Sequence, residues 1–201
     1  MNNKKNNKNR YQADESEDVE YALGRKVAVY KQSPNTIHFY DEIDRETIFE
    51  LKKIISSMIA DRFVDEINIV INSFGGMGTG FYDYLKACPL PINTYVEGYC
   101  CSAATLLFLA GKNRYISPTS LFMIHSFSSS APEVANEGQA ADFSESMKKH
   151  NQFLVEAIYK KETKLPKKLI ESIPYKEIWL TPEECIEYKI ASEVKTYFAI
   201  P

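Results

Sequence analysis

Short β-branched runs alternate with helical patterns along most of this chain, and this alternation restricts the fold more than any other feature of the sequence. Ile67–Asn72 reads INIVIN and suits a buried strand, and Ile92–Val96 is a second run of the same kind. Before them, Asp44 can cap a helix that runs to about Ala60 with apolar residues at helical spacing. Repeated strand–helix alternation predicts a parallel sheet covered by helices, and therefore an α/β fold.

Further elements continue the pattern. We expect strands at Lys26–Lys31, Asn35–Tyr40, Tyr115–Ile116 and Leu121–Ile124, and helices to about Leu85, over Ala103–Ala110 and from Gly138 to about Lys161. Thr181-Pro182-Glu183-Glu184 has capping-box spacing with proline at the first helical position, which predicts a helix start. In parallel sheets the active groups lie on loops that follow the carboxyl ends of strands, so we expect the functional residues on these loops.

Length and composition favour one folded domain with a polar tail. The chain has 201 residues, which as a prior means a single domain. Its first ten residues, MNNKKNNKNR, are a low-complexity tract, and an acidic cluster follows as far as Glu20. Such a segment buries too little apolar surface to offset its ordering entropy. We therefore predict a disordered polar tail over 1–20 and a single domain over 21–201.

Charge and cysteine content exclude several classes of protein. Twenty-four basic and 27 acidic side chains give a formal charge of −3, which argues against a dedicated nucleic-acid binder. The longest apolar run, Ala103–Ala110, is far shorter than the ~20 residues of a membrane span, and residues 1–20 hold no apolar core of a secretory signal. The four cysteines have no CxxC spacing, and no Walker A pattern is present. We expect a reduced, cytoplasmic protein without membrane, nucleic acid, metal or cofactor.

Three strand-end loops carry residues that could do chemistry. Gly75-Gly76 follows the INIVIN strand and either offers backbone N–H groups to a ligand or simply makes a tight turn. Ser102 stands where the apolar helix begins, either as a nucleophile or as a common N-cap residue. His125 leaves an apolar strand for a serine-rich loop and could be the general base for a serine hydroxyl. Cys100 and Cys101, beside Ser102, are interpreted as packing residues.

The same three loops appear in one order within a longer set of motifs. The set is EIDRETIFEL (Glu42–Leu51), INSFGG (Ile71–Gly76), GYCCSAA (Gly98–Ala104), FMIHS (Phe122–Ser126), GQAADF (Gly138–Phe143) and WLTPEECIEY (Trp179–Tyr188). In this order and spacing the chain resembles the proteolytic subunit of the Clp protease (ClpP), with some likeness to phage head-maturation proteases of the same fold. The resemblance runs from about Thr36 to Val194, about four fifths of the chain.

The resemblance implies a role for each matched residue. Ser102 falls on the nucleophile and His125 on the general base, while Gly76 and Ala103 fall on the backbone donors of the oxyanion hole. Glu177 falls where the family usually has the aspartate of the triad. A glutamate can orient an imidazole as aspartate does, but a solvated surface charge beside a lysine is the equally weighted alternative.

The resemblance also implies an architecture and partners. It predicts a ClpP/crotonase-like spiral of βαβ units with a protruding long helix, the handle, after Gln139. It implies a homo-oligomer of stacked rings that cleaves peptides or unfolded proteins, with an AAA+ unfoldase as a partner that would bring the ATP. Phe74 replaces the family's usual proline, and the N-terminal tail does not resemble the family's axial loop, which places unfoldase docking in question.

Three functions remain as alternatives to an ATP-dependent serine endopeptidase. A non-catalytic structural subunit of a mixed ring would account for glutamate at the acid position, although such a subunit has no need of both Ser102 and His125. A phage-type maturation protease would share the catalytic residues. An acyl-CoA hydratase or isomerase would share the wider fold but would use carboxylates instead of a serine–histidine pair.

Overall fold

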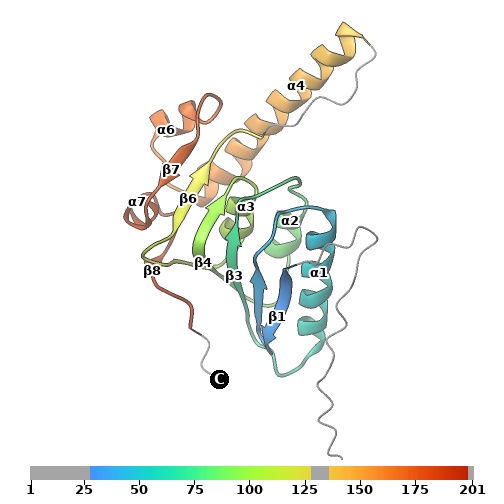
Figure 1. Cartoon of the computed structure of the whole chain (residues 1–201), viewed down its shortest axis with the longest axis vertical. Helices are drawn as coiled ribbons and strands as arrows, with labels where there is room; N and C mark the ends of the chain where they lie inside the picture. The colour runs from blue at the N-terminus through green and yellow to red at the C-terminus, as the bar shows by residue number, and fades with distance from the viewer. Residues whose placement is uncertain (1–27, 128–135, 199–201) are drawn as a thin grey trace, which may run out of the picture.

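Parallel strands joined by helices form the centre of the structure, a computed structural model that describes residues 28–127 and 136–198 (Figure 1). The elements in chain order are β1 (Val29–Ser33), β2 (Thr36–Phe39), α1 (Arg45–Ala60), β3 (Ile67–Ser73), α2 (Phe81–Lys86), β4 (Ile92–Cys101), α3 (Ala104–Leu109), β5 (Asn113–Ile116), β6 (Leu121–Ile124), α4 (Glu137–Leu154), the π-helical η1 (Val155–Tyr159), α5 (Lys160–Glu162), α6 (Lys167–Ser172), β7 (Ile178–Leu180), α7 (Pro182–Glu187) and β8 (Glu193–Val194). The predicted tail over 1–20 lies outside the described residues.

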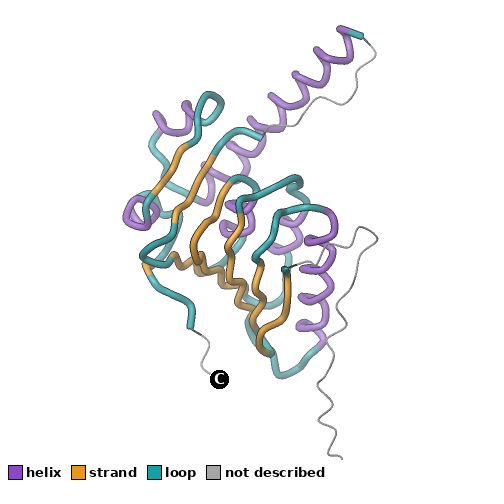
Figure 2. Tube along the Cα trace, in the orientation of Figure 1, coloured by secondary structure: helices purple, strands orange, loops and turns teal. Residues whose placement is uncertain are grey.

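The strands form one mixed sheet, drawn in orange in Figure 2. Its order is β1-β2-β3-β4-β5-β8, and β6 pairs with the second half of β4 and with β7. The pairs β2–β3, β3–β4, β4–β5, β4–β6 and β5–β8 are parallel, whereas β1–β2 and β6–β7 are antiparallel. The predicted α/β fold is therefore confirmed, with antiparallel strands added to the parallel centre.

Strand β4 is longer than the sequence predicted. We expected a strand over Ile92–Val96 and a junction after it, but β4 continues to Cys101. Gly98 has φ +90, a backbone conformation that favours glycine, and it lets the strand change direction between its two halves. After this bend the amide of Tyr99 donates to Asn72 Oδ1, and the strand leaves β5 to pair with β6. The bend brings the end of β4 beside the end of β6.

Two predicted helix starts are confirmed by their capping hydrogen bonds. Asp44 accepts from the amide of Thr47, whose hydroxyl oxygen accepts from the amide of Asp44, at the start of α1. Thr181 and Glu184 form the same reciprocal box at the start of α7. Strands β7 and β8 and helix α6 were not predicted, because two, three or six residues are too short for a periodic pattern to show.

The apolar core lies between the sheet and the helices α1, α2 and α3. Figure 1 shows α1 and α2 lying along the same side of the sheet. All six residues of α3 are buried, as are the isoleucines of β3 that alternate along its core face. A fully buried side chain of this size contributes roughly 1.5–3 kcal/mol. Within α1, Met58 is fully buried, whereas the next residue, Ile59, is 39% exposed.

Helix α4 is the predicted protruding helix, and Figure 1 shows most of it extending away from the sheet. It starts at Glu137, one residue before the predicted position, and its cap is Asn136. The predicted end near Lys161 is also close, but the run is not one regular α-helix, since the π-helical turn η1 interrupts it. Only its last residue, Leu154, is buried within α4.

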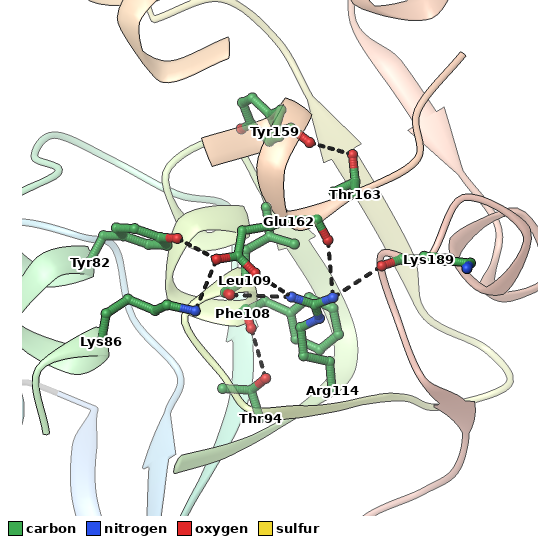
Figure 3. A network of polar contacts seen from close by, with 10 residues as sticks. All are labelled: Tyr82, Lys86, Thr94, Phe108, Leu109, Arg114, Tyr159, Glu162, Thr163 and Lys189. Carbon is green, nitrogen blue, oxygen red and sulfur yellow. Dashed lines mark hydrogen bonds and ion pairs between the residues drawn. The ribbon is translucent and has the colours of Figure 1, made fainter. Parts of the chain in front are cut away.

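A polar network fixes the C-terminal end of this helical run to the sheet (Figure 3). The Glu162 carboxylate accepts from Tyr82, Lys86 and Arg114 at 2.7, 2.9 and 3.0 Å. The Arg114 guanidinium also donates to the carbonyl oxygens of Glu162 and Lys189. Burial raises the pKa of Glu162, but hydrogen bonds from Lys86 and Tyr82 and the charges of Lys86 and Arg114 outweigh burial and leave this pKa below its usual value.

Candidate active site

Ser102 is held in a strained turn between β4 and α3. Its φ is +54, which an L-residue adopts at a cost of about 1–2 kcal/mol. Its amide donates to the carbonyl of Met123 on β6, so the nucleophile candidate is tied to the strand that precedes His125. The alternative of an N-cap serine is wrong: Ala103 occupies the cap position of α3, and no side chain caps this helix.

The Ser102 hydroxyl and the His125 imidazole are in direct contact. Ser102 Oγ lies 2.6 Å from His125 Nε2, and both residues are half-buried. The contact follows from the sheet, because β4 and β6 are parallel neighbours with Cys101 opposite Met123. The carboxyl ends of the two strands therefore deliver one side chain each to the same edge. A serine oxygen at hydrogen-bond distance from an imidazole nitrogen is the arrangement of a general base with its nucleophile.

Two further residues, which the sequence analysis missed, fix the main chain of Ser102. The Ser102 carbonyl accepts from the amide and the hydroxyl of Thr105, at 3.0 and 2.5 Å. The Thr105 oxygen lies 2.7 Å from the hydroxyl of Tyr159 in η1. Burial raises the pKa of Tyr159 to about 12, so its hydroxyl remains a donor at neutral pH. The helical spacing of Thr105 from Ser102 was a weak signal, but nothing in the sequence pointed to Tyr159.

The glycine pair packs directly against this turn. Gly75 and Gly76 have φ of +98 and +145, conformations that favour glycine. A Cβ added at Gly75 would lie 2.6 Å from both Ser102 Cβ and the Cys101 carbonyl oxygen. Gly76 is packed as tightly against the backbone of Ile43. Within residues 28–127 and 136–198, no backbone carbonyl accepts a hydrogen bond from the amide of Gly76 or of Ala103.

Glu177 lies opposite His125 when the pairing of β6 with β7 is continued by one residue, but its carboxylate is hydrogen-bonded to another side chain. Strands β6 and β7 are antiparallel with Ile124 opposite Ile178, so the next pair in this register is His125 and Glu177. Directly opposite side chains have Cβ atoms about 4.5–5.5 Å apart and project to the same face. The exposed Glu177 carboxylate nevertheless accepts from the indole Nε1–H of Trp179 at 3.0 Å. It is also close enough to Cys101 to help raise the pKa of that thiol.

The two cysteines beside Ser102 are packing residues, as the sequence suggested. Both are fully buried. Burial raises the pKa of Cys100 well above its usual value and that of Cys101 to about 11, with a further contribution from Glu177 at Cys101. A thiol that stays protonated at neutral pH is a poor nucleophile. All four cysteines are free.

The residue that replaces the family's proline makes an aromatic contact. The ring of Phe74 stacks on Tyr99 with centroids 4.6 Å apart and an interplanar angle of 28°. Phe74 is 65% exposed, so the pair lies at the surface next to the glycine turn. The stacking joins the end of β3 to the second half of β4 and supports the loop that contacts Ser102.

A cavity of about 310 Å³ is lined in part by Gly78 and Phe127, each two residues beyond Gly76 and His125 respectively. Its lining residues follow the two loops of the site and continue onto α4: Gly78, Thr79, Phe127, Ser146, Met147 and His150. Over the described part of the chain, no group of three or more His, Cys, Asp or Glu side chains is arranged to hold a metal ion. In that same part, no helix combines the length and the apolarity that crossing a membrane requires.

Comparison with known proteins gives one family for nearly the whole chain. A family model described as Clp protease matches residues 25–197. Among curated proteins, the chloroplastic ATP-dependent Clp protease proteolytic subunit 3 of Arabidopsis thaliana is 27% identical over 188 residues. That similarity covers 81% of this chain and 59% of the relative, so the chain spans about three fifths of the relative's length.

Proposed function

The chain belongs to the Clp protease family, and from this premise we propose that it is a serine-type endopeptidase that cleaves peptides or unfolded proteins. The observation that carries the proposal is the 2.6 Å contact between Ser102 Oγ and His125 Nε2. A hydratase or isomerase of the wider fold would have no use for this contact, because those enzymes act through carboxylates.

The proposed reaction is acyl transfer through a serine ester. Ser102 Oγ attacks the scissile carbonyl carbon while His125 Nε2 accepts the hydroxyl proton, and the same proton then passes to the leaving amine. The amides of Gly76 and Ala103 donate to the oxyanion of the tetrahedral intermediate. Water, deprotonated by His125, hydrolyses the acyl-enzyme and releases the second product. Each oxyanion donor contributes on the order of 3 kcal/mol in comparable enzymes.

Glu177 is the proposed third member of the catalytic triad. It would act when its carboxylate gives up the hydrogen bond from Trp179 and accepts one from His125 instead. Its place opposite His125 when the β6–β7 register is continued supports this role, since directly opposite side chains project to the same face. Bound to His125 Nδ1–H, the carboxylate would fix the tautomer that leaves Nε2 free to accept the serine proton. The observed bond to Trp179 favours one alternative, a non-catalytic subunit of a mixed ring.

The cavity beside the pair is the proposed position of one substrate side chain. Its walls are mainly apolar or small, with the imidazole of His150 and the hydroxyls of Thr79 and Ser146 as polar groups. Because its volume of about 310 Å³ exceeds that of any amino-acid side chain, size alone sets a weak specificity.

The assembly and partners are proposed from the family. Homo-oligomeric stacked rings would enclose the active sites in a chamber, and the protruding α4 would supply the contact between rings. An AAA+ unfoldase would feed unfolded chains into that chamber and would carry the ATP, because no cofactor is expected in this chain. The cytoplasm is the proposed location. A phage-type maturation protease with the same catalytic residues is the alternative.

Replacement of the proposed nucleophile tests the function. We expect Ser102→Ala to abolish both hydrolysis of a fluorogenic peptide and labelling by a fluorophosphonate, because it removes the hydroxyl that His125 contacts. Ser57→Ala, on an exposed position of α1, is the matched control and should retain both. Continued labelling of Ser102→Ala would show that another residue is the nucleophile, whereas an inactive wild-type chain would favour the non-catalytic subunit.

A further inference from the structure

The main chain that carries His125 leaves the sheet at this residue. Strand β6 ends at Ile124, which is paired with Ile178 of β7. On the other side, the last bond to the β4 strand end is donated by the Ser102 amide to the Met123 carbonyl. Beyond these contacts, the sheet does not fix the position of the imidazole. A base that must stay within hydrogen-bond reach of its nucleophile needs a second support.

That support comes from a single amide side chain on α4. Asn151 Oδ1 accepts from the amide of Phe127 at 2.5 Å, and Asn151 Nδ2 donates to the Phe127 carbonyl at 3.0 Å. One side chain thus provides the acceptor and the donor that a neighbouring strand would otherwise provide. The contact is half-buried, and the Phe127 ring packs edge-on against His150 with centroids 5.0 Å apart.

A carboxamide suits this contact because its oxygen accepts and its nitrogen donates. Lysine has no acceptor and aspartate at neutral pH has no donor, so neither could bind both the N–H and the C=O of one residue. The two anchored residues, Met123 and Phe127, stand two positions before and two positions after His125. His125 is therefore the midpoint of a five-residue segment that is fixed at both ends.

We propose that Asn151 is a positioning residue for His125, an inference that rests on the proposed peptidase function. The hydrogen bonds of the Asn151 side chain go to the main chain of Phe127 and not to the Ser102 hydroxyl or the imidazole, so it acts two residues beyond His125. Without it the imidazole would lose its alignment with Ser102 Oγ, while the sheet and the other five residues that line the substrate cavity remain in place. The chemical step should then suffer more than substrate binding does.

The test compares Asn151→Ala with Gln152→Ala in the full chain. Gln152 is the next residue along α4 and is exposed, so both variants shorten a polar amide on the same helix. We expect Asn151→Ala to lower kcat for a fluorogenic peptide, and the rate of fluorophosphonate labelling, by about 10- to 100-fold. KM should change by less than about threefold, since loss of alignment at the reacting atoms leaves ground-state binding intact. Gln152→Ala should match the wild type.

A second variant separates alignment from folding. Asn151→Leu keeps the size of the side chain and removes both hydrogen bonds, so it should lose kcat as Asn151→Ala does while its thermal midpoint stays near that of Gln152→Ala. Wild-type kcat in both Asn151 variants would overturn the proposal. A raised KM with unchanged kcat would also overturn it, because this result would make Asn151 a determinant of substrate binding.

The proposal can fail separately from the peptidase function. A wild-type chain that neither hydrolyses peptide nor reacts with fluorophosphonate would refute the function but not the contact. In that case the positioning role is tested by NMR, through the ring ¹⁵N signals of His125 in a ¹⁵N-histidine-labelled chain. The chain has three histidines to assign. The signals should shift or broaden in Asn151→Ala and not in Gln152→Ala, and unchanged signals would refute the positioning role.

Discussion

Gly75→Ala is the substitution whose effect follows most directly from the structure. The new Cβ would lie 2.6 Å from Ser102 Cβ and from the Cys101 carbonyl oxygen, whereas ordinary contact begins at about 3.4 Å. The glycine turn and the Ser102 turn must therefore separate by about 0.8 Å, and neither contact can be relieved by rotating a long side chain. A φ of +98 adds about 1–3 kcal/mol of strain, and overpacking about 1–3 kcal/mol more.

We expect Gly75→Ala to lower the free energy of unfolding by about 2–6 kcal/mol, the sum of strain and overpacking. In the folded fraction, displacement by nearly 1 Å should slow fluorophosphonate labelling of Ser102 by on the order of 100-fold. Urea unfolding followed by far-UV circular dichroism measures the free energy of unfolding. The labelling rate is measured without urea and divided by the folded fraction that the unfolding curve gives.

Substitutions at two other glycines separate the effect of backbone strain from the effect of overpacking. Gly78 has φ +129 but nothing within 4 Å of an added Cβ, so Gly78→Ala should show the strain of about 1–3 kcal/mol without overpacking. Gly80 has an ordinary φ of −64 and equal free space, so Gly80→Ala should be neutral or gain up to about 1 kcal/mol with unchanged labelling. If Gly75→Ala is no less stable than Gly78→Ala and is labelled at the wild-type rate, the close approach is refuted.

Two further predictions concern carboxylates. Because the pKa of Glu162 is lowered in the folded state, its contribution to stability is complete above its usual pKa of 4.5 and is lost as pH falls through the lowered value. Urea unfolding between pH 7 and pH 3 should therefore depend less on pH in Glu162→Gln than in the wild type or in the exposed control Glu171→Gln. Glu177→Gln should lower kcat by on the order of 10²- to 10⁴-fold if the carboxylate orients His125. A kcat within a few-fold of the wild type would leave Ser102 and His125 as a dyad.

The features that the sequence predicted well depend on neighbouring residues. The helix start at Asp44 is decided by residues within one turn of it, and the β-branched run of β3 has a composition that identifies it as a buried strand. The features that it missed depend on distant parts of the chain. The length of β4 is set by its pairing with β6 after a bend at Gly98, and the contact of Tyr159 with Thr105 spans 54 residues. The strand that places Glu177 opposite His125 has only three residues, too few for any pattern.

The backbone of Ser102 is itself an argument for function. In the described part of the chain, only Ser102 and Lys189 have a positive φ without being glycine. Lys189 directly follows the C-terminal cap residue of α7, where amides of Ile190 and Ala191 bond back to the Cys185 carbonyl, and a left-handed residue commonly ends a helix in this way. Ser102 stands before a helix, where no such ending applies, and glycine would adopt the same φ at no cost. The only thing that serine adds there is a hydroxyl, and that hydroxyl contacts His125. The strained φ of Ser102 therefore places a hydroxyl against His125, an arrangement that glycine could not provide.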